Sequence, residues 1–501
     1  MFQEKVLSPF LNSIQKFSER NAFYIGGEYF TYKQLGERVC SIRSLLKDNS
    51  DEVIALIANN DLETYASIFA LWLEGKAYIP INPDVPHERN CSIIEQVNIT
   101  TVLDSTDKVI HFGGSNTIAT KYNNVRFLGE MYNPVSVDDK RIAYILFTSG
   151  STGVPKGVPI SRENLAYFVE SFWDLGYELN HEDRCLQMFE LTFDLSVVSY
   201  LIPLLVGGCV YTIPKDKIKY SYIYELMDEH ELTMALMVPS MLNYLRPYFD
   251  EIDCPKMKYS MFCGEALYLS IVNEWAKCVP NAQIDNVYGP TENTIYCTRY
   301  SFNRTSNNEV KNDVLSIGKA MYNSYIEVFD EKNEIADIGE AGELCLSGKQ
   351  LTAGYYNNDK MNKEKFFFKN IEGREIRFYR TGDLCVRNST GNFDFIGRAD
   401  SQVKIQGYRI ELGEIEFHCR EFLKDINVVA VTFTNSSNNT EIALAIESNE
   451  RISLVEELKE YLYSKIPVYM IPTRYHFVSR FAVNSSDKID RVQIKKRIEN
   501  E

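Results

Sequence analysis

Paired metal-binding cysteines are missing from this chain. It has 11 cysteines at irregular spacings, with no C-x-x-C pair and no cluster of cysteine with histidine. Structural zinc sites use such paired ligands, so the common zinc-binding modules are excluded. The irregular spacing also gives no disulfide framework, and free thiols are typical of a reducing compartment. We therefore predict a cytoplasmic protein without structural disulfides or zinc.

A long uninterrupted hydrophobic run is also missing. The most apolar stretch, 196–213, approaches the length of a membrane span, but Pro203, Gly207 and Gly208 interrupt it and Asp194 precedes it. The first ten residues hold no long apolar segment of the kind found in secretory signals. We therefore expect 196–213 to form a buried core element, and we predict no membrane insertion.

Positive charge is scarce. Lysine and arginine number 53 against 69 aspartates and glutamates, which gives a formal net charge of −16. A chain this acidic does not bind nucleic acid or anionic membranes nonspecifically, so neither is an expected partner. An anionic ligand must instead be held by local positive groups and a metal ion.

The opening third alternates strand-like and helix-like segments. Residues 53–57 have the pattern of a buried strand, and residues 62–73 have helical periodicity that Gly75 ends. A further strand is expected at 77–80, and the alternation returns at 234–238. This order is typical of layered α/β units built on largely parallel sheets.

The pattern changes from about residue 325 to short strands with turn signals. With 501 residues, two or more domains are expected. The predicted fold class is α/β, with a large N-terminal domain over 1–399 that has layered sheets and a small β-rich part. A small α+β domain over 400–501 follows it, with the boundary near Asp400. The later elements are expected as strands at 325–329, 343–346, 392–396, 427–433 and 442–446, and as a helix at 454–465 stopped by Pro467.

The most informative motif is the run Phe-Thr-Ser-Gly-Ser-Thr-Gly-Val-Pro-Lys-Gly at 147–157, directly after the apolar segment 142–146. Glycines let the backbone approach an anion, hydroxyl and N–H groups donate to phosphate oxygens, and the lysine adds positive charge. The G-x-x-x-x-G-K-[ST] spacing of a Walker loop is absent. A flexible surface loop is the alternative, but a strand leading into this composition favours phosphate binding.

A second motif, Tyr-Gly-Pro-Thr-Glu at 288–292, follows the strand-like segment 282–287. The carboxylate of Glu292 suits a hard divalent cation such as Mg²⁺, and the hydroxyl of Thr291 suits a phosphate. A lone turn of this composition is more often structural. Its occurrence together with the 147–157 loop favours a ligand site.

A third cluster combines 379–383 with 397–400. The carboxylate of Asp383 can accept both hydroxyl protons of a ribose, and the guanidinium of Arg398 suits a sugar or phosphate oxygen. Each alone would be taken for a turn or a surface ion pair. A run with two glycines follows at 402–416, and a charged run at 487–491 places Lys488 near the end of the sequence.

Taken together and in this order, these motifs resemble the adenylate-forming superfamily of acyl-CoA synthetases, luciferases and amino-acid adenylation domains, over about 32–491. The resemblance implies a large N-terminal domain and a mobile C-terminal domain, with ATP and Mg²⁺ required. ATP and a carboxylate would give an acyl-adenylate and pyrophosphate, and a thiol would then displace AMP. Such transfers are accelerated mainly by positioning and charge neutralisation.

The resemblance also implies roles for single residues. Thr291 would contact the α-phosphate, Glu292 would hold Mg²⁺, and Lys488 would bridge the carboxylate and the α-phosphate as the catalytic lysine. Asp400 matches the hinge, and Gly407 lies on the loop expected to face the site during thiol transfer. The sequence departs from the family at Ser486-Asp487-Lys488, where Asn-Gly-Lys is usual. The implied ATP-binding residues are Thr148, Ser149, Gly150, Ser151, Thr152, Gly153, Lys156, Gly264, Glu265, Ala266, Asn286, Tyr288, Asp383 and Arg398.

The segment 193–198 resembles the amino-acid branch, in which the aspartate, here Asp194, pairs with the substrate ammonium. A carboxylate beside an apolar pocket is costly unless a cation neutralises it. The alternative is an aspartate satisfied by backbone donors. The other pocket walls would be Leu195, Val198, Leu236, Met261, Cys263, Val287, Ile295 and Tyr296. They carry no second charge, which favours a small or medium uncharged side chain.

The segments 261–265 and 414–418 look most like D-alanine–carrier-protein ligases, whereas 85–93 and 409–414 also suit stand-alone adenylation enzymes of peptide natural-product pathways. No carrier-type Gly-Gly-Asp-Ser motif follows Arg491, so the phosphopantetheine thiol is expected on a separate carrier protein. We therefore predict an AMP-forming amino-acid:carrier-protein ligase. An acyl-CoA ligase and a relative that binds an adenylate without loading a carrier remain the alternatives.

Overall fold

The computed structural model describes residues 1–108, 110–121, 133–150, 153–424, 426–435, 437–448, 455–482 and 489–499. The chain forms two compact units. Unit 1 comprises 1–82, 97–146 and 157–399, and unit 2 comprises 83–96, 147–156 and 400–501. The predicted boundary between domains stays a prediction. Unit 2 takes up residues from Asp400 onward, but it also includes two short segments that the predicted division places in the first domain.

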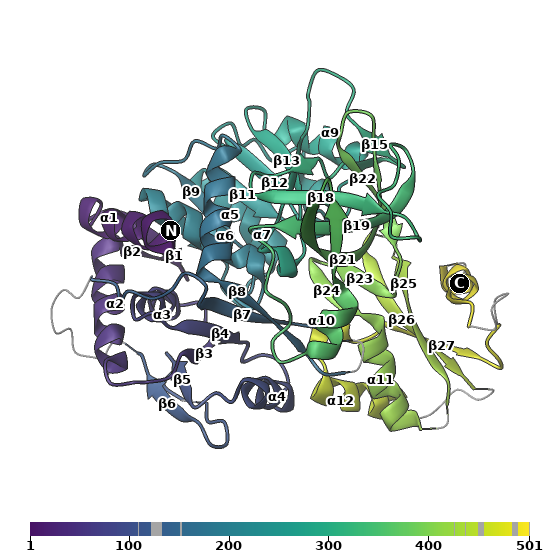
Figure 1. The fold of residues 1–501 in the computed structure, drawn as a ribbon, viewed down its shortest axis with the longest axis horizontal. Helices are drawn as coiled ribbons and strands as arrows, with labels where there is room; N and C mark the ends of the chain where they lie inside the picture. Colours follow the sequence, from purple (N-terminus) through teal and green to yellow (C-terminus); the bar gives the residue numbers. More distant parts are fainter. Residues whose placement is uncertain are drawn as a thin grey trace. The chain divides into compact units, whose positions relative to one another are not determined.

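A six-stranded sheet carries the first α/β layer, in the order β6-β5-β3-β4-β7-β8. The predicted strand at 53–57 and helix at 62–73 are confirmed as β3 (Val53–Ile57) and α3 (Leu62–Leu73). Asp61 caps α3 by accepting from the Thr64 amide at 2.8 Å, and Gly75 leaves the helix with φ +72°. Figure 1 shows α3 next to α2 (Tyr32–Leu46), beside this sheet. The other strands are β4 (Ala77–Ile81), β5 (Thr101–Asp104), β6 (Asn116–Ala119), β7 (Ile142–Thr148) and β8 (Lys156–Ser161).

A nine-stranded sheet forms the second layer, in the order β17-β14-β13-β12-β11-β9-β10-β1-β2. Its centre is parallel, as the β–α alternation predicts, and antiparallel pairs close both ends. Its strands are β1 (Asn21–Ile25), β2 (Glu28–Thr31), β9 (Arg184–Gln187), β10 (Cys209–Thr212), β11 (Met234–Met237), β12 (Tyr259–Phe262), β13 (Gln283–Tyr288), β14 (Thr298–Ser301) and β17 (Lys319–Ala320).

The apolar stretch 196–213 forms a buried core element, as predicted. It comprises most of α6 (Asp194–Val206), which is buried on all sides, followed by β10. Gly207 ends the helix in the left-handed region. No helix among the described residues is long and apolar enough to cross a membrane. The remaining helices of unit 1 are α1 (Ser8–Lys16), α5 (Arg162–Asp174), α7 (Lys219–His230), α8 (Ser240–Leu245), α9 (Leu269–Cys278) and α10 (Asp359–Lys365).

An antiparallel sheet follows in unit 1, where the sequence predicts short strands. Its order is β18-β19-β21-β20, and β22 also pairs with β21. This sheet places Asp383 of β21 directly opposite Arg398 of β22. The strands are β18 (Ser324–Phe329), β19 (Ala341–Gly348), β20 (Phe366–Ile371), β21 (Arg374–Arg387) and β22 (Phe393–Arg398), and a small ribbon pairs β15 (Val310–Lys311) with β16 (Val314–Leu315).

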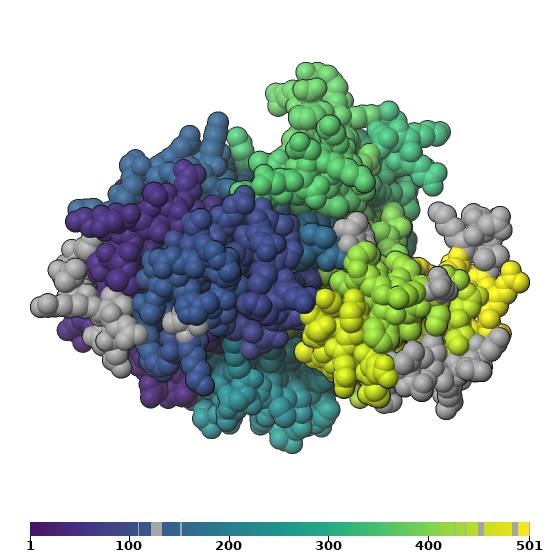
Figure 2. Space-filling model, turned by 90° about the horizontal axis from the view of Figure 1, so that it is seen from below, coloured from purple at the N-terminus to yellow at the C-terminus, as the bar shows by residue number. Residues whose placement is uncertain are grey.

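The C-terminal part of unit 2 is a small α+β fold around its own buried cluster, which includes Ile410, Ile415 and Leu444. Figure 2 shows its yellow-green and yellow residues gathered side by side. The predicted strands at 427–433 and 442–446 are confirmed, and the helix predicted from 454 is described from Val455. The elements of this C-terminal part are β23 (Gln402–Ile405), β24 (Tyr408–Glu411), α11 (Leu412–Leu423), β25 (Val428–Thr434), β26 (Thr440–Glu447), α12 (Val455–Lys465), β27 (Arg474–Val478) and α13 (Arg491–Glu499). The segment 83–96 of unit 2 holds most of α4 (His87–Val97).

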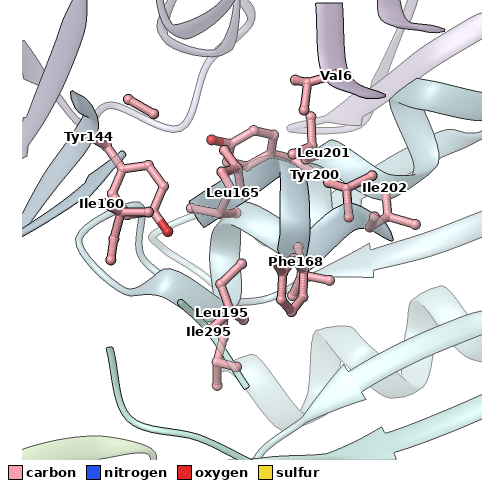
Figure 3. Packing of buried hydrophobic residues seen from close by; sticks show 14 of the residues in the cluster. Val6, Tyr144, Ile160, Leu165, Phe168, Leu195, Tyr200, Leu201, Ile202 and Ile295 are labelled. Atoms are coloured by element: carbon pink, nitrogen blue, oxygen red, sulfur yellow. The ribbon is translucent and has the colours of Figure 1, made fainter. Parts of the chain in front are cut away.

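The main core of unit 1 joins the two layers. Figure 3 shows part of it, with Leu165 and Phe168 of α5, Leu195 of α6, Ile295 and the ring of Tyr144. The structure describes all 11 cysteines; none forms a disulfide, and all except Cys91 are buried. The fold class is therefore the predicted mixed α/β class with several sheets.

Candidate active site

The amino-acid pocket predicted from the sequence maps to buried positions of unit 1. Its eight uncharged wall residues all belong to one buried hydrophobic cluster. They come from α6, from the neighbouring parallel strands β11, β12 and β13, and from residues that follow β12 and β13. The members are Leu195, Val198, Leu236, Met261, Cys263, Val287, Ile295 and Tyr296.

Asp194 is the first residue of α6 and is only 9% exposed. The carboxylate lies close enough to Tyr144 of β7 to influence that phenol. Burial and then the nearby charge of Asp194 raise the pKa of Tyr144 well above its usual value. The Tyr144 hydroxyl is buried and has no hydrogen-bond partner in the described structure. A carboxylate and an unpaired phenol therefore lie together at the head of α6.

A buried trio forms around Asp383. The Tyr288 hydroxyl donates to one carboxylate oxygen at 2.5 Å, and the Arg398 guanidinium donates to the other at 2.5 Å. Arg398 also donates to the Thr381 carbonyl at 3.1 Å. Burial and then the charge of Asp383 raise the pKa of Tyr288, which keeps this phenol a donor. The structure thus joins three residues predicted for nucleotide binding, and each carboxylate oxygen keeps a second lone pair.

Glu292 lies on a short helical turn, Thr291–Asn293, and is fully buried. The Tyr355 hydroxyl donates to its Oε1 at 2.6 Å and lies 3.2 Å from the Tyr379 hydroxyl. Sequence reasoning missed Tyr355. In the sequence it is an ordinary tyrosine after Gly354, and it stands 63 residues from the carboxylate that it contacts.

Asn286, Gly264, Glu265 and Ala266 stand near strand ends of the nine-stranded sheet. The Asn286 amide donates to the carbonyls of Leu315 and Ser316 at 3.2 and 3.0 Å. Glu265 accepts from the Ser240 amide at 2.8 Å. These two side chains therefore also stabilise the fold, and their nucleotide role stays a prediction.

The described part of the 147–157 loop makes its contacts within unit 2. The Gly150 amide donates to Oε2 of Glu414 at 3.2 Å, and the Lys156 ammonium lies 3.3 Å from Oε1 of Glu411. The Ser149 hydroxyl donates to the Arg409 carbonyl at 2.8 Å. The groups predicted to bind phosphate therefore contact carboxylates of the chain itself.

Two glycines of this loop have no room for a side chain. A Cβ at Gly150 would lie 2.1 Å from the Val154 carbonyl oxygen. Gly153 has φ +79°, and its Cβ would lie 2.6 Å from the Phe417 ring. The Thr148 hydroxyl is 3.5 Å from the Lys156 carbonyl. The tight turn expected from the glycines is thus present, whereas Ser151 and Thr152 lie outside the described residues.

Glu414 is also paired with Arg89 of α4 at 2.5 Å, and both side chains are largely buried. The two residues are 325 positions apart in the sequence. Both segments contribute to the family resemblance, but sequence reasoning assigned neither residue a role. No local pattern indicates that they meet.

Three other predicted residues belong to the C-terminal part of the chain. Asp400 accepts from the Gln402 amide at 3.1 Å, and Gly407 has φ +82° in the turn between β23 and β24. Lys488 lies outside the described residues. Their predicted roles as hinge, thiol-transfer loop and catalytic lysine stay predictions.

No group of three or more His, Cys, Asp or Glu side chains that could hold a metal ion occurs among the described residues. Glu292 instead offers a single carboxylate. Mg²⁺ is usually bound by one or two carboxylates together with substrate phosphates, so a lone glutamate of this kind fits that ion.

Sequence comparison gives a family match over 10–356 to the family of AMP-binding enzymes. Zwittermicin A synthase ZmaJ of Bacillus cereus is 31% identical over 477 residues, which cover 93% of this chain and 89% of that protein. Bacitracin synthase 1 of Bacillus licheniformis is 31% identical over 488 residues, or 96% of this chain. The chain spans only 9% of that much longer protein.

Structure comparison gives the same relationship. The adenylation domain AlmE of Vibrio cholerae, solved in complex with glycyl-adenosine-5′-phosphate, superposes with a TM-score of 0.86 at 25% identity. The match covers 99% of this chain and 97% of AlmE. The resemblance to the adenylate-forming superfamily is therefore confirmed, and the chain belongs to the family of AMP-binding enzymes.

Proposed function

We propose that the chain activates an amino acid with a small or medium uncharged side chain, such as D-alanine, as an aminoacyl-AMP. It then transfers the acyl group to the phosphopantetheine thiol of a carrier protein supplied as a separate polypeptide. The 11 free cysteines favour a reducing compartment, the cytoplasm.

The buried carboxylate of Asp194 is the observation that carries this proposal. Asp194 stands at the head of α6, next to pocket walls that carry no other charge. An ammonium group of the substrate would neutralise it, which a fatty or aryl acid could not do. The helix N-terminus also favours a carboxylate, so the experiment must separate the two effects. AlmE, which was solved with a glycyl-adenylate, supports a small amino acid.

In the first half-reaction, a carboxylate oxygen of the amino acid attacks the α-phosphorus of ATP. The bond to the bridging oxygen breaks, and pyrophosphate leaves with its electron pair. The amide of Gly150 and the ammonium of Lys156 would donate to the pyrophosphate, and Thr291 to the α-phosphate. Lys488 would stabilise the charge that builds between the two reacting groups.

Asp383 would accept from the ribose, held in place by Tyr288 and Arg398. Glu292, held by Tyr355, would bind Mg²⁺. The bound ion supplies positive charge that neutralises the phosphates. In the second half-reaction, the thiol sulfur attacks the acyl carbon, the acyl–oxygen bond to AMP breaks, and the thiol proton goes to solvent.

ATP–pyrophosphate exchange, measured with glycine and with both enantiomers of the other amino acids, tests the proposal. We expect exchange with one or a few small or medium uncharged amino acids. The same amino acid should then be transferred to the thiol of holo-carrier protein and not to coenzyme A. Exchange with fatty or aryl acids alone would favour the acyl-CoA ligase, and nucleotide binding without exchange would favour a non-loading relative.

A further inference from the structure

The backbone is strained directly after Glu292. Thr294 and Ile295 have φ values of +52° and +75°. Both are β-branched and buried, and such residues rarely adopt this left-handed region. Strain of this kind persists only where the surroundings hold it, and it concentrates at functional sites. The residues 288–296, called the 288–296 turn below, must therefore be held by specific contacts. The group that makes these contacts is called the brace.

The brace is the side chain of Gln350. It is fully buried, and its amide nitrogen lies within hydrogen-bonding distance of three carbonyl oxygens of the turn. The acceptors belong to Asn293 at 3.4 Å, Thr294 at 3.4 Å and Tyr296 at 3.0 Å. In return, the Thr294 hydroxyl donates to the Gln350 carbonyl at 2.5 Å. A single side chain thus contacts both sides of the strained pair.

Gln350 is itself held in place. The Asn164 amide donates to the carbonyls of Lys349 and Leu351, at 2.8 and 3.2 Å, on either side of it. Asn164 is part of the capping box that begins α5. One step further, the Thr352 amide donates to the Glu292 carbonyl at 2.9 Å. The turn is therefore tied to the start of α5 through 349–352.

The residues before and after the bend of the turn, called its two arms, also lie very close together. A Cβ at Gly289 would lie 2.3 Å from the Cα of Tyr296. One arm carries Thr291 and Glu292, proposed for phosphate and Mg²⁺, and the other carries Ile295 and Tyr296, proposed as pocket walls. A change in the strained pair must therefore move both arms together.

We propose that Gln350 is a positioning residue that sets both the rate of adenylation and the choice of amino acid. It acts through the turn and contacts no reacting atom. This inference rests on the proposed function, because it assigns the two arms to that reaction.

The test compares Gln350→Met, which keeps the length but removes the donors, with Gln350→Glu, which places an acceptor against three carbonyls. Ser260→Ala is the control, since it removes a buried hydrogen bond from Trp275 at 2.9 Å, away from the turn. Exchange is measured as kcat, KM for each substrate, and the kcat/KM ratio between the best and second-best amino acid.

We expect Gln350→Met to lower kcat by about 100-fold, because small misplacements near reacting groups have effects of that size. The selectivity ratio should fall as well, and Ser260→Ala should change only the Tm. The inference is overturned if Gln350→Met lowers the Tm alone and leaves kcat and the ratio at the wild-type values.

Hydrogen exchange gives a readout that does not depend on the reaction. The Thr294 and Cys297 amides donate to the carbonyls of Thr291 and Tyr288, at 3.2 and 2.8 Å. Both should lose protection in Gln350→Met and keep it in Ser260→Ala. Unchanged protection would show that Gln350 does not hold the turn, even if wild-type protein activates no amino acid. Lost protection without wild-type exchange would refute the proposed function, and with it the positioning role, while Gln350 would remain a structural brace.

Discussion

The 288–296 turn and the 147–157 loop satisfy their polar groups in opposite ways. In the turn, carbonyls and carboxylate accept from buried neighbours of the same unit, such as Gln350 and Tyr355. In the loop, the donors contact carboxylates from elements more than 250 residues further along the chain. The turn is thus organised before any ligand arrives, whereas the donors of the loop already contact anionic groups.

This difference bears on the binding roles proposed for the two regions. Glu292 is held by a hydrogen bond from Tyr355 of the same unit. In the proposed function, a phosphate at Gly150 and Lys156 would displace the carboxylates of Glu414 and Glu411. Both contacts are charge-assisted hydrogen bonds, which are the stronger kind.

Lys488→Ala should produce the largest effect of all. We expect adenylation to fall by about 10²–10³, the usual loss when a group that stabilises transition-state charge is removed. Thiol transfer from a preformed adenylate should stay largely intact, since the lysine serves one half-reaction. Both rates are measured separately, with Lys459→Ala at a partly exposed position of α12 as the control. Equal losses in both half-reactions would point to a general defect.

Asp194→Ala should produce the next largest effect, a raised KM for the amino acid. Removing one partner of a desolvated charge pair costs about 3 kcal/mol at the lower end of the usual range, which predicts an amino-acid KM raised by about 10². Asp61→Ala, at the head of α3, is the matched control: this carboxylate caps its helix and accepts from the Thr64 and Ser105 hydroxyls, and no ligand role is proposed for it. It should lower the Tm with KM unchanged. An Asp194 variant with the same profile would refute the ammonium-binding role.

Glu414→Gln tests the loop itself. The change removes the charge that faces Arg89 and the Gly150 amide, but it keeps an acceptor oxygen. We expect stability to fall by about 3 kcal/mol, because the buried Arg89 guanidinium loses the negative charge that neutralises it. The KM for ATP should fall at the same time, since less must be displaced from the loop. Glu88→Gln, which breaks an exposed pair with Lys465, should change neither value.

Much of the fold could be predicted from local pattern. The strand at 53–57 and the helix at 62–73 occur where predicted, because buried periodicity and end signals act over a few residues. The trio at Asp383 was predicted in part for a similar reason. Asp383 and Arg398 are opposite each other on neighbouring strands, 15 residues apart, so the two motifs that contain them stay close.

The contacts missed by sequence reasoning join distant parts of the chain. Arg89 meets Glu414 across 325 positions, and Gln350 meets Tyr296 across 54. No period or spacing reports such pairs, because they depend on how whole elements pack. The strain at Ile295 was equally invisible, since a β-branched residue in sequence gives no sign of a positive φ.

The smallest predicted effect is a change in the labelling rate of two thiols, one near each of the two regions. Cys297 directly follows the 288–296 turn, and its full burial raises its pKa to about 12. Cys91 lies on α4, two residues from Arg89, and is only partly buried. Its pKa is also raised, by partial burial and then by Glu95, so its labelling should be slow and should rise with pH.

Iodoacetamide at mildly alkaline pH should therefore label one thiol per native chain, Cys91, and all 11 in guanidinium, as counted by mass. Glu414→Gln should speed labelling at Cys91, because Arg89 of α4 loses the charge of Glu414 that holds it in place. The same variant should leave Cys297 protected. Gln350→Met should do the reverse, since it loosens the turn beside Cys297 and leaves α4 unchanged. Equal acceleration at both thiols in either variant would mean that the turn and the loop are not held independently, and the contrast between them would fail.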